Sequence, residues 1–540
     1  MPSTKYIFVT GGVVSSLGKG IISSSIGKLL QARGYKITIQ KFDPYINIDP
    51  GTLNPYEHGE CYVTADGMET DLDLGHYERF TGIRTTRHNS QTTGRIYKAV
   101  IDKERSGEYL GHTIQVVPHI TDEIKRRIKY LGETGGYDFV ITEIGGTIGD
   151  IESAPFLEAI RQMKWELGRD AVCIHLTYVP YLKAADELKT KPTQHSVKEL
   201  QANGIQPDIL ILRTEKHLDD HLRAKVAGFC NVDLECVIQS EDLPSIYEVP
   251  VNMQKQGLDA AIMRKMGIPV GETPQLGQWN RFLEMRRSAS QTVNIGLVGK
   301  YDLQDAYKSI SESLSHAATY NNRKVNITFI NSEQLESIDS PAWTTLRGQD
   351  GLVICPGFGQ RGIVGKISAT RYARENDIPC FGICLGMQMT VIEFARDVLG
   401  YTDADSTEMN ASTAHNVIDL MEEQKNVTQM GGTMRLGEYP CVIGSGSRAL
   451  EAYGGKAEIA ERHRHRYEFN NRYREEFEKA GMKCVGVNPD ADLVEIVEIP
   501  SLRWYIGTQF HPEYSSTVLN PHPLFMSFIK ASIAYGDSQA

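Results

Sequence analysis

The sequence predicts an α/β protein with two domains, because short apolar runs alternate with segments of helical periodicity and one polar stretch interrupts the series. In the first half, this alternation is typical of a parallel sheet with helices on both faces. The polar stretch begins at Gly271 and predicts a linker over residues 271–292. We therefore expect a first domain at residues 1–270 and a second α/β domain at residues 293–540.

The predicted elements of the first domain follow the chain in order. Apolar runs predict strands at Tyr6–Thr10, Lys36–Gln40, Asp138–Glu143, Ala171–Thr177, Asp208–Arg213 and Leu234–Gln239. Helical periodicity predicts helices at Gly20–Arg33, Ile120–Leu131, Ala154–Leu167 and Leu218–Cys230. Residues 42–110 break into polar, Gly- and Thr-rich segments, which we interpret as long active-site loops.

The second domain begins a new series of strands. Apolar runs predict them at Val293–Gly299, Val325–Ile330, Gly351–Cys355 and Pro379–Ile383. A helix is predicted at Met389–Val398, and residues 401–430 are polar with little periodicity, which indicates an excursion from the fold.

The composition narrows the class of protein. A net charge of −11 and a pI near 5.8 argue against a non-specific nucleic-acid binder. Nine cysteines without a CxxC pair favour reduced thiols over disulfides or a zinc site. The first residues lack the apolar core of a signal peptide, and no apolar window is long enough to span a bilayer. We expect a cytoplasmic protein with neither nucleic acid nor membrane as partner.

A cysteine between two glycines predicts a catalytic nucleophile in the second domain. Cys384 follows a predicted strand and precedes a predicted helix, within Gly382-Ile-Cys-Leu-Gly386. This is the elbow pattern of hydrolytic α/β enzymes, with Cys in place of Ser. The helix N-terminus favours thiolate and offers backbone N–H groups to an oxyanion. His511 and Glu513 lie two residues apart, so on an extended segment they point the same way, as a base and its orienter.

The first predicted strand leads into a glycine-rich loop and a helix, which is the context of a phosphate-binding loop. Glycines permit close backbone approach, the helix N-terminus faces the anion, and Lys19 reaches the terminal phosphates. The spacing departs from the Walker pattern, because five residues separate Gly12 from Gly18. Gly20 also stands where a Ser or Thr would bind Mg²⁺.

Carboxylates are therefore expected to hold the metal. Asp73 lies in the polar region and Glu143 ends a predicted strand, at the edge of the sheet where open α/β sheets bind ligands. Asp71 is the competing choice to Asp73. Mg²⁺ is commonly bound by one or two carboxylates together with substrate phosphates.

A basic segment, residues 189–196, combines two lysines with hydroxyl and amide side chains. Such groups suit a second phosphorylated ligand whose base is read by hydrogen bonds.

The motifs taken together resemble known families. Residues 382–388, Gly-Ile-Cys-Leu-Gly-Met-Gln, and residues 511–513, His-Pro-Glu, resemble the class I glutamine amidotransferases over roughly residues 293–530. Longer stretches resemble the CTP synthase family over nearly the whole chain: Tyr6–Gly20, Lys41–Gly51, Glu69–Phe80, Glu143–Glu152 and Lys189–Leu200.

The resemblance implies a P-loop-type synthetase domain followed by a glutamine amidotransferase domain. It implies a glutamine-hydrolysing, ATP-dependent C–N ligase. In that family ATP phosphorylates O4 of UTP, and ammonia then displaces the phosphate to give CTP, the last committed step of de novo pyrimidine nucleotide synthesis. Mg²⁺ is the implied cofactor. ATP, UTP and glutamine are the implied substrates, GTP the activator and CTP the inhibitor. The implied assembly is a homotetramer, and whether tetramers form filaments is left open.

Site residues carry over from the matching positions. The triad maps onto Cys384, His511 and Glu513, and the metal ligands onto Asp73 and Glu143. ATP would contact Ser16, Leu17, Gly18, Lys19, Gly20, Ile21, Lys41 and Asp73. UTP or CTP would contact Ser15, Asp150, Ile151, Glu152, Lys189, Thr190, Lys191, Pro192, Thr193, Gln194 and Lys225. Glutamine would contact Gly357, Leu385, Gly386, Met387, Gln388, Glu408 and Arg466. Arg435 resembles the position tied to GTP activation, and His58 one near the entrance of an ammonia passage.

The chain departs from the family pattern at three places. Pro356 precedes Gly357 where the family has a glycine, so only an N–H at Gly357 or later can serve the oxyanion. Ser106 stands where bacterial members commonly have Arg, in a segment tied to GTP, and Glu241 replaces a Lys near the adenine.

Two alternatives belong to other functional classes. One is a partitioning-type ATPase switch fused to an inactive amidotransferase-like domain, against which the full set of Cys, His and Glu argues. The other is a different ATP-dependent amidotransferase, of cobyrinate amidase type, against which residues 189–194 argue.

Overall fold

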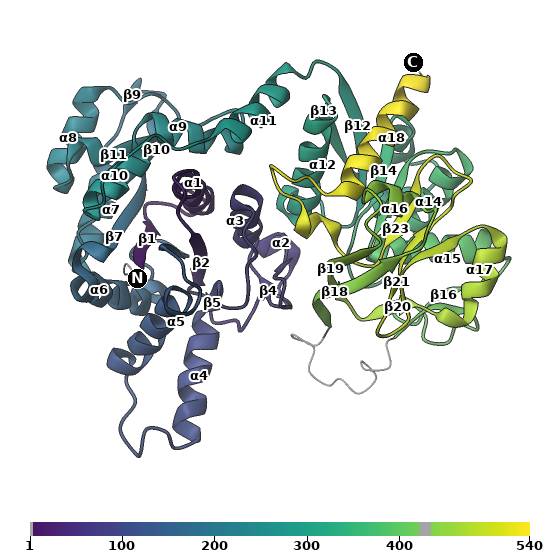
Figure 1. Ribbon diagram of the computed structural model, residues 1–540, viewed down its shortest axis with the longest axis horizontal. Helices are drawn as coiled ribbons and strands as arrows, with labels where there is room; N and C mark the ends of the chain where they lie inside the picture. Colours follow the sequence, from purple (N-terminus) through teal and green to yellow (C-terminus); the bar gives the residue numbers. More distant parts are fainter. Residues whose placement is uncertain (1–3, 421–433, 540) are drawn as a thin grey trace. The chain divides into compact units, whose positions relative to one another are not determined.

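The computed structural model describes residues 4–420 and 434–539, which form two compact units (Figure 1). Unit 1 contains the chain up to Asp49 and Asp73–Gln278, and unit 2 contains Pro50–Leu72 and the chain from Trp279 onward. Pro50–Leu72 thus packs with unit 2, although it lies in the first half of the sequence.

Unit 1 is built on a seven-stranded parallel sheet with strand order β11-β10-β7-β1-β6-β2-β5. Six of its strands are confirmed within a few residues of the predicted ranges. β5 was missed because it is a three-residue polar strand, buried only through tertiary packing. The strands are β1 (Lys5–Gly11), β2 (Ile37–Asp43), β5 (Ser90–Thr92), β6 (Phe139–Ile144), β7 (Ala171–Tyr178), β10 (Ile209–Thr214) and β11 (Val237–Glu241).

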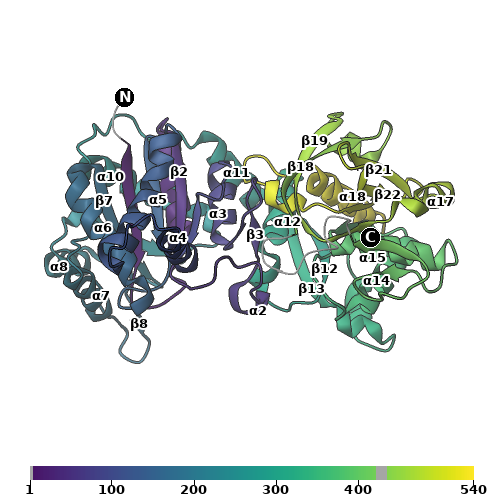
Figure 2. The ribbon, with the colours of Figure 1, turned by 90° about the horizontal axis from the view of Figure 1, so that it is seen from below.

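Helices cover both faces of this sheet (Figure 2). Tyr6 and Phe8 of β1 share an apolar cluster with the helices α5 and α6, and the next residues of β1 face the opposite side by strand alternation. On that side α1 packs Gly27 against Ile37 and Ile39. The helices are α1 (Lys19–Ala32), α3 (Asp73–Thr81), α4 (Thr93–Arg105), α5 (Thr121–Thr134), α6 (Ala154–Leu167), α7 (Lys191–Ala202), α8 (Asp220–Cys230), α9 (Val249–Lys255) and α10 (Leu258–Lys265). A short hairpin pairs β8 (Tyr181–Leu182) with β9 (Glu187–Leu188).

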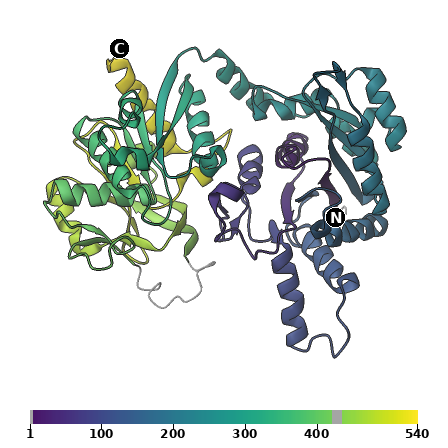
Figure 3. The ribbon, with the colours of Figure 1, turned by 180° about the vertical axis from the view of Figure 1, so that it is seen from behind.

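The prediction of long loops over residues 42–110 was wrong. This region holds α3, β5 and α4, and also the elements that join unit 2: α2 (Pro55–His58), β3 (Tyr62–Val63) and β4 (Glu69–Thr70). Every residue of α3 from Leu74 to Thr81 is buried, including His76, Glu78 and Arg79. A helix buried all round has no polar face, so its sequence lacks the expected periodicity. The helix α4 extends away from the sheet (Figure 3).

Unit 2 is built on a nine-stranded sheet with strand order β13-β12-β14-β15-β23-β22-β21-β18-β19. The ladders are parallel from β13 to β23 and antiparallel from there to β19. The four predicted strands are confirmed. The strands are β12 (Thr292–Gly299), β13 (Lys324–Asn331), β14 (Gly351–Ile354), β15 (Cys380–Ile383), β18 (Arg435–Ile443), β19 (Glu458–His465), β21 (Lys483–Asn488), β22 (Leu493–Glu498) and β23 (Tyr505–Thr508).

Two apolar clusters cover the two faces of the second sheet. One contains residues of α14 and α15, and the other residues of α12 and α18. The predicted helix at Met389–Val398 starts earlier than expected, at Leu385, because the chain turns into the helix directly after Cys384. The helices are α11 (Gly277–Ser288), α12 (Lys308–Tyr320), α13 (Ala342–Arg347), α14 (Ile363–Glu375), α15 (Leu385–Asp397), α16 (Arg448–Ala452), α17 (Arg474–Ala480) and α18 (Pro523–Gln539).

Most of the predicted polar excursion at 401–430 is described up to residue 420. Within it, β16 (Asp405–Ser406) and β17 (Asn416–Leu420) form a three-stranded sheet with β20 (Tyr467–Phe469). Residues 421–430 lie outside the described residues.

Candidate functional site

The turn at Cys384 explains the two glycines beside it. Cys384 has φ 53° and ψ −107°, between the end of β15 and the start of α15. A Cβ at Gly386 would lie 2.0 Å from the backbone oxygen of Ile354, and one at Gly382 would lie 2.8 Å from the backbone of Gly386. Only glycine fits at both positions, so the Gly-x-Cys-x-Gly pattern follows from the sharpness of the turn.

The three predicted triad residues meet beside this turn. β23 pairs with β15, which brings His511 and Glu513 near Cys384. His511 Nδ1 lies 2.6 Å from Glu513 Oε1, and both side chains are buried. Burial alone would lower the pKa of His511, but the Glu513 carboxylate and the Cys384 thiol raise it to about 10. The imidazole is therefore protonated at neutral pH, with the Glu513 carboxylate as its partner.

A cavity of about 190 Å³ opens onto the triad. Its wall includes Cys384, His511 and Glu513, and also Gly357, His58 and other residues of the Pro50–Leu72 segment. The sequence did not predict that this segment belongs to unit 2.

Buried hydrogen bonds hold the Pro50–Leu72 segment against unit 2. Arg464 Nε donates to Glu69 Oε1 at 2.8 Å, and Arg462 donates to the Tyr62 hydroxyl at 2.9 Å. Tyr62 in turn donates to the backbone oxygen of Tyr514 at 3.0 Å. The backbone oxygen of Arg462 accepts from the backbone N–H of His511 at 2.8 Å. The backbone oxygen of Arg464 accepts from the Cys384 thiol at 3.8 Å. One strand, β19, therefore holds both the segment and the catalytic residues.

The candidate glutamine residues are arranged around the same turn. Leu385, Gly386, Met387 and Gln388 form the first turn of α15, in which the backbone N–H groups of the first three have no helical partner and that of Gln388 bonds the Cys384 oxygen at 3.2 Å. Gln388 is buried and donates to the backbone oxygen of Tyr467 at 3.0 Å. Glu408 Oε1 accepts from the Gly359 N–H at 2.8 Å. Arg466 follows β19 directly and is half-buried.

Arg435, the predicted GTP-linked residue, is turned into the protein. Its guanidinium is buried and bonds Glu495 at 2.8 Å and Glu468 at 3.2 Å. Ser106, where the family resemblance predicts an Arg, ends α4 by donating to the backbone oxygen of Lys103 at 2.9 Å.

The predicted phosphate loop joins β1 to α1 in unit 1. Val13, Ser16 and Gly18 have positive φ, so the loop takes a tight path before the helix N-terminus. Lys19 is the first residue of α1, and its ammonium donates to the backbone oxygen of Gly146 at 2.8 Å. The loop after β6 thus meets the phosphate loop at the carboxyl edge of the sheet.

The predicted metal ligands surround a buried lysine. Lys41 Nζ contacts Asp73, Glu143 at 3.1 Å and Asp43 at 3.7 Å. Burial alone would raise the pKa of Asp73, but Lys41, His76 and Lys19 hold it at about 2. Burial raises the pKa of Glu143, against the effect of Lys41.

Gly20 leaves room for one of these carboxylates. A Cβ on Gly20 would lie 2.1 Å from Asp73 Oδ1, so the carboxylate occupies the space that a Ser or Thr side chain would fill. The competing candidate, Asp71, lies in unit 2, where it lines the cavity at Cys384.

The predicted pyrimidine-nucleotide residues divide into inward and outward groups. Thr193 is fully buried and bonds Thr177, and Gln194 donates to the Thr190 hydroxyl at 3.2 Å, so these side chains fix the start of α7. Lys189, Lys191 and Pro192 are less buried, and Lys191 lies over the ring of Phe229 on α8. Lys225 is exposed on the same helix.

The remaining nucleotide residues lie on loops at the carboxyl edge of the sheet in unit 1. Asp150, Ile151 and Glu152 follow β6 and are exposed, Ile151 by 87%. Ser15 lines a cavity of about 290 Å³ with Tyr178 and Arg213.

An adjoining cavity of about 150 Å³ joins the phosphate loop to residues that, apart from Glu241, the sequence analysis missed. Ser16, Leu17, Gly18 and Ile21 line one side. The other side is formed by side chains at the ends of β10 and β11 and in the segment after β11: Arg213, Ser240, Glu241, Leu243, Ser245, Ile246 and Val249. The strand order could have indicated Arg213, because it ends a strand at this edge of the sheet.

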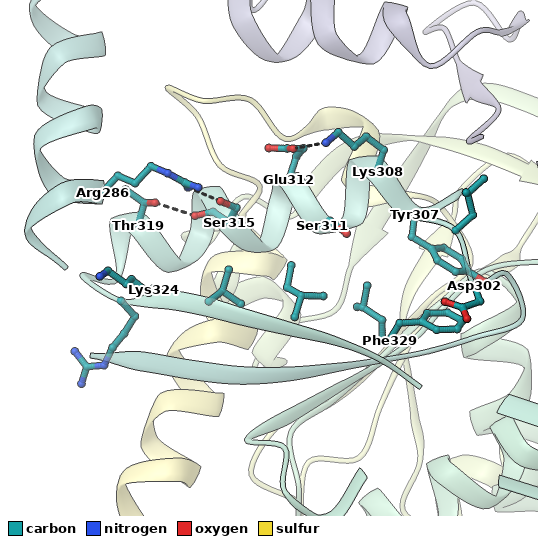
Figure 4. Close-up of a pocket in the computed structure, with 15 residues that line it drawn as sticks. Arg286, Asp302, Tyr307, Lys308, Ser311, Glu312, Ser315, Thr319, Lys324 and Phe329 are labelled. Carbon is teal, nitrogen blue, oxygen red and sulfur yellow. Dashed lines mark hydrogen bonds and ion pairs between the residues drawn. The ribbon is translucent and has the colours of Figure 1, made fainter. Parts of the chain in front are cut away.

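A larger cavity of unit 2, about 700 Å³, contains none of the predicted residues (Figure 4). It lies between α12 and the strands β12 and β13, with Arg286 bonded to Ser315 and Lys308 paired with Glu312. These interactions engage part of the polar lining of the cavity.

Three further features bear on the predictions from composition. All nine cysteines are free, as expected. Within residues 4–420 and 434–539, every helix is too short or too polar to cross a bilayer. In the same described ranges, no three His, Cys, Asp or Glu side chains are grouped to hold a metal ion by themselves.

Comparisons with known proteins identify the family of the chain. Residues 5–268 match the model of the CTP synthase N-terminus, and residues 302–531 match that of the class I glutamine amidotransferases. The chain belongs to the CTP synthase family. A CTP synthase of Bacteroides thetaiotaomicron is 71% identical over 99% of both chains. One of Porphyromonas gingivalis is 64% identical over 99% of this chain and 98% of the relative.

Membership of the CTP synthase family excludes the two alternative classes considered from the sequence. Among solved structures, the glutaminase domain of Trypanosoma brucei CTPS with bound acivicin is 39% identical. The aligned region covers 45% of this chain and 94% of the Trypanosoma brucei chain, with a TM-score of 0.43.

The thiols of this family member are expected to differ sharply in reactivity. Burial raises the pKa of seven of them: Cys173, Cys230, Cys236, Cys355, Cys380, Cys441 and Cys484. Because the thiolate is the nucleophile, iodoacetamide at pH 7 should label only Cys384 and the half-exposed Cys61. His511→Ala should slow labelling of Cys384 and leave Cys61 unchanged. Peptide mapping measures both, and urea-unfolded protein, in which all nine react, is the control. Labelling of Cys355 as fast as Cys384 would contradict the assignment.

Proposed function

We propose that this protein catalyses the ATP-dependent amination of UTP to CTP, with ammonia released from glutamine in unit 2. Membership of the CTP synthase family carries the proposal, and two groups of residues support it. One is the Cys384–His511–Glu513 triad, and the other is the phosphate loop with Lys41 between Asp73 and Glu143.

The glutaminase half-reaction follows from the geometry of unit 2. The Cys384 thiolate attacks the carboxamide carbon of glutamine, and the carbonyl electron pair moves onto oxygen. N–H groups of Leu385 and of Gly357 or a later loop residue would stabilise that oxyanion. His511 donates its proton to the leaving nitrogen, while Glu513 orients the ring. Water then releases glutamate from the thioester. Ammonia must leave unprotonated, because ammonium has no free electron pair.

The synthetase half-reaction uses positive charge in unit 1. Lys19 at the start of α1 would bind the terminal phosphates of ATP, and Lys41 would neutralise charge on the transferred phosphoryl group. The acceptor is O4 of UTP, and ammonia displaces the phosphate from C4. The exposed lysines Lys189, Lys191 and Lys225 suit the triphosphate of UTP.

Mg²⁺ is the cofactor that these residues fit. A buried carboxylate, Glu143, and a partly exposed one, Asp73, next to a phosphate loop match the common arrangement for Mg²⁺, in which substrate phosphates supply the other ligands. Asp73 and Glu143 would hold it, and the ion would neutralise charge between the β- and γ-phosphates.

Regulation and assembly complete the proposal. We infer a cytoplasmic homotetramer that GTP activates and CTP inhibits, with nucleotide sites shared between subunits. Unit 1 exposes large apolar side chains on two loops and a helix, which suits burial against other subunits: Ile101, Leu110, Val116, Val117 and Ile151. Because the Arg435 guanidinium is buried, its effect on GTP activation would pass through Glu468 and Glu495 rather than through direct contact.

Separation of the two chemistries is the first test. Cys384→Ala should lower glutamine-dependent CTP formation by about 10³-fold or more, because it removes the nucleophile. CTP formation from ammonium chloride should remain near the rate of the unsubstituted protein, since it needs only unit 1. The absorbance change from UTP to CTP measures both. Loss of both activities in a folded variant would contradict the proposal.

The metal assignment has its own test. Asp73→Asn should raise the Mg²⁺ concentration that ammonia-dependent CTP formation requires, or abolish the activity. The reason is that the variant has one carboxylate fewer to balance the charge of the ion. Glu143→Gln should do the same. Asp71→Asn is the matched control and should leave the titration unchanged. The opposite result, with the shift in Asp71→Asn alone, would move the ligand to Asp71.

Assembly and inhibition are tested together. UTP with ATP and Mg²⁺ should shift sedimentation towards the tetramer, because a ligand that touches two subunits binds the oligomer more tightly. CTP should compete with UTP, and Glu152→Lys should relieve CTP inhibition more than it harms use of UTP. An unchanged sedimentation coefficient together with non-competitive inhibition by CTP would overturn the shared-site model.

A further inference from the structure

Two buried lysines hold the loop that carries the candidate oxyanion donors. The loop, Cys355–Gly359, follows β14 and borders the cavity at Cys384. Lys300 directly follows β12 and is 1% exposed, and Lys366 lies in α14 and is 0% exposed. Neither residue was part of the site predicted from the sequence.

The lysines bond four of the five carbonyl groups of this loop. Lys366 Nζ donates to the backbone oxygens of Cys355 and, at 3.5 Å, Pro356. Lys300 Nζ donates to those of Phe358, at 2.8 Å, and Gly359. The Gly357 carbonyl is the one left without a lysine.

The direction of these bonds fixes the direction of the amides. In a trans peptide the C=O of one residue and the N–H of the next point in opposite directions. The Pro356 oxygen is directed at Lys366, so the Gly357 N–H points away from that lysine. The same rule applied to Phe358 directs the Gly359 N–H away from Lys300, and this amide does bond Glu408 at 2.8 Å. Among the described residues, no acceptor lies within hydrogen-bonding distance of the Gly357 N–H.

Proline makes this support necessary. Pro356 has no N–H, so the peptide before it offers no donor, and the loop's first possible oxyanion donor is Gly357. A glycine-containing loop also has many accessible backbone conformations, and an amide that must meet a developing charge has to be held in place beforehand.

The charge of Lys366 is buried without a carboxylate partner in the described part of the chain, which lowers the stability of the fold. It has no ion-pair partner among the described residues, and its bonds go to backbone oxygens alone. Burial lowers its pKa to about 8, opposed by the nearby Cys355 and Cys384 sulfurs, so the ammonium form still predominates at neutral pH. A buried charge without a carboxylate is unfavourable for stability. Such a placement is expected where the charge supports a site.

We propose that Lys366 and Lys300 are positioning residues that direct the Gly357 N–H at the oxyanion formed when Cys384 attacks glutamine. This rests on the proposed glutaminase function and adds two residues to it. In that step a C–S bond forms, the carbonyl electron pair moves onto oxygen, and the Gly357 N–H bonds the negative oxygen. The lysines touch neither substrate nor sulfur; they act through the loop.

The test compares two reactions of the same sulfur in Lys366→Met and Lys300→Met of the full chain. Glutamine hydrolysis, with saturating UTP, ATP and Mg²⁺, passes through an oxyanion. Alkylation of Cys384 by iodoacetamide is a displacement at carbon and forms none. We expect kcat for hydrolysis to fall about 10²-fold, the lower range for loss of one oxyanion donor, with KM for glutamine nearly unchanged. Alkylation rates and their pH profile should match those of the unchanged protein.

The controls separate this inference from the other possibilities. Lys456→Met, at an exposed lysine of unit 2, should change neither reaction. Ammonia-dependent CTP formation should persist in every variant, and the unfolding midpoint reports whether each is folded. If Lys366→Met does not fold, Lys300→Met carries the comparison.

Three results would overturn the proposal. Hydrolysis that is unchanged in a folded variant would show that the loop holds its shape without the lysine. A parallel fall of hydrolysis and alkylation would show that the lysine acts on the thiolate instead. A rise in KM with constant kcat would assign it to ground-state binding. Absence of hydrolysis in the unchanged protein would instead refute the proposed function.

Discussion

The buried pair of Arg464 and Glu69 is the interaction on which the glutaminase site depends. The guanidinium of Arg464 bonds Glu69 at 2.8 Å and the backbone oxygen of Gly51 at 3.1 Å, while its own backbone oxygen accepts from the Cys384 thiol. One residue therefore connects the nucleophile to the Pro50–Leu72 segment. That segment closes one side of the cavity, and Asp73, the residue after it, enters unit 1 beside Lys41. Removal of one partner would leave the other charge buried and unpaired, which is a costly change.

Much of both sites could be predicted from the sequence because their signals are local. The phosphate loop, Cys384 and the His511–Glu513 pair each lie within a few residues of a strand end, where glycine and charge patterns report the turn directly. The role of Pro50–Leu72 could not be predicted in this way. Glu69 and Arg464 are 395 residues apart, and neither sequence neighbourhood indicates the other. Likewise α3 is buried all round, so the apolar and polar faces that reveal a helix are absent.

Gly20 departs from the Walker pattern, and this departure led to the prediction of a metal ligand elsewhere in the sequence. The missing hydroxyl led to the expectation that a carboxylate serves the metal, and the structure supplies the steric reason. Asp73 Oδ1 lies 2.1 Å from the place of a Cβ on Gly20, so a Ser or Thr and this carboxylate cannot both be present. The sequence analysis chose Asp73 and kept Asp71, two residues away, as the competing choice. The structure supports the choice of Asp73, because Asp73 begins α3 beside Lys41 in unit 1 and Asp71 belongs to unit 2.

Both units use lysines to hold loops, and the choice of lysine has a physical reason. Lys19 bonds the Gly146 oxygen, Lys366 the Cys355 and Pro356 oxygens, and Lys300 those of Phe358 and Gly359. An ammonium is compact and offers three donors from one atom, so it can bond several oxygens that converge on one point. A planar guanidinium suits the parallel oxygens of a carboxylate, as Arg374 shows with Glu393. Loops whose carbonyl groups turn inward around one lysine therefore direct their N–H groups outward, where an anionic group of a substrate or transition state can bind.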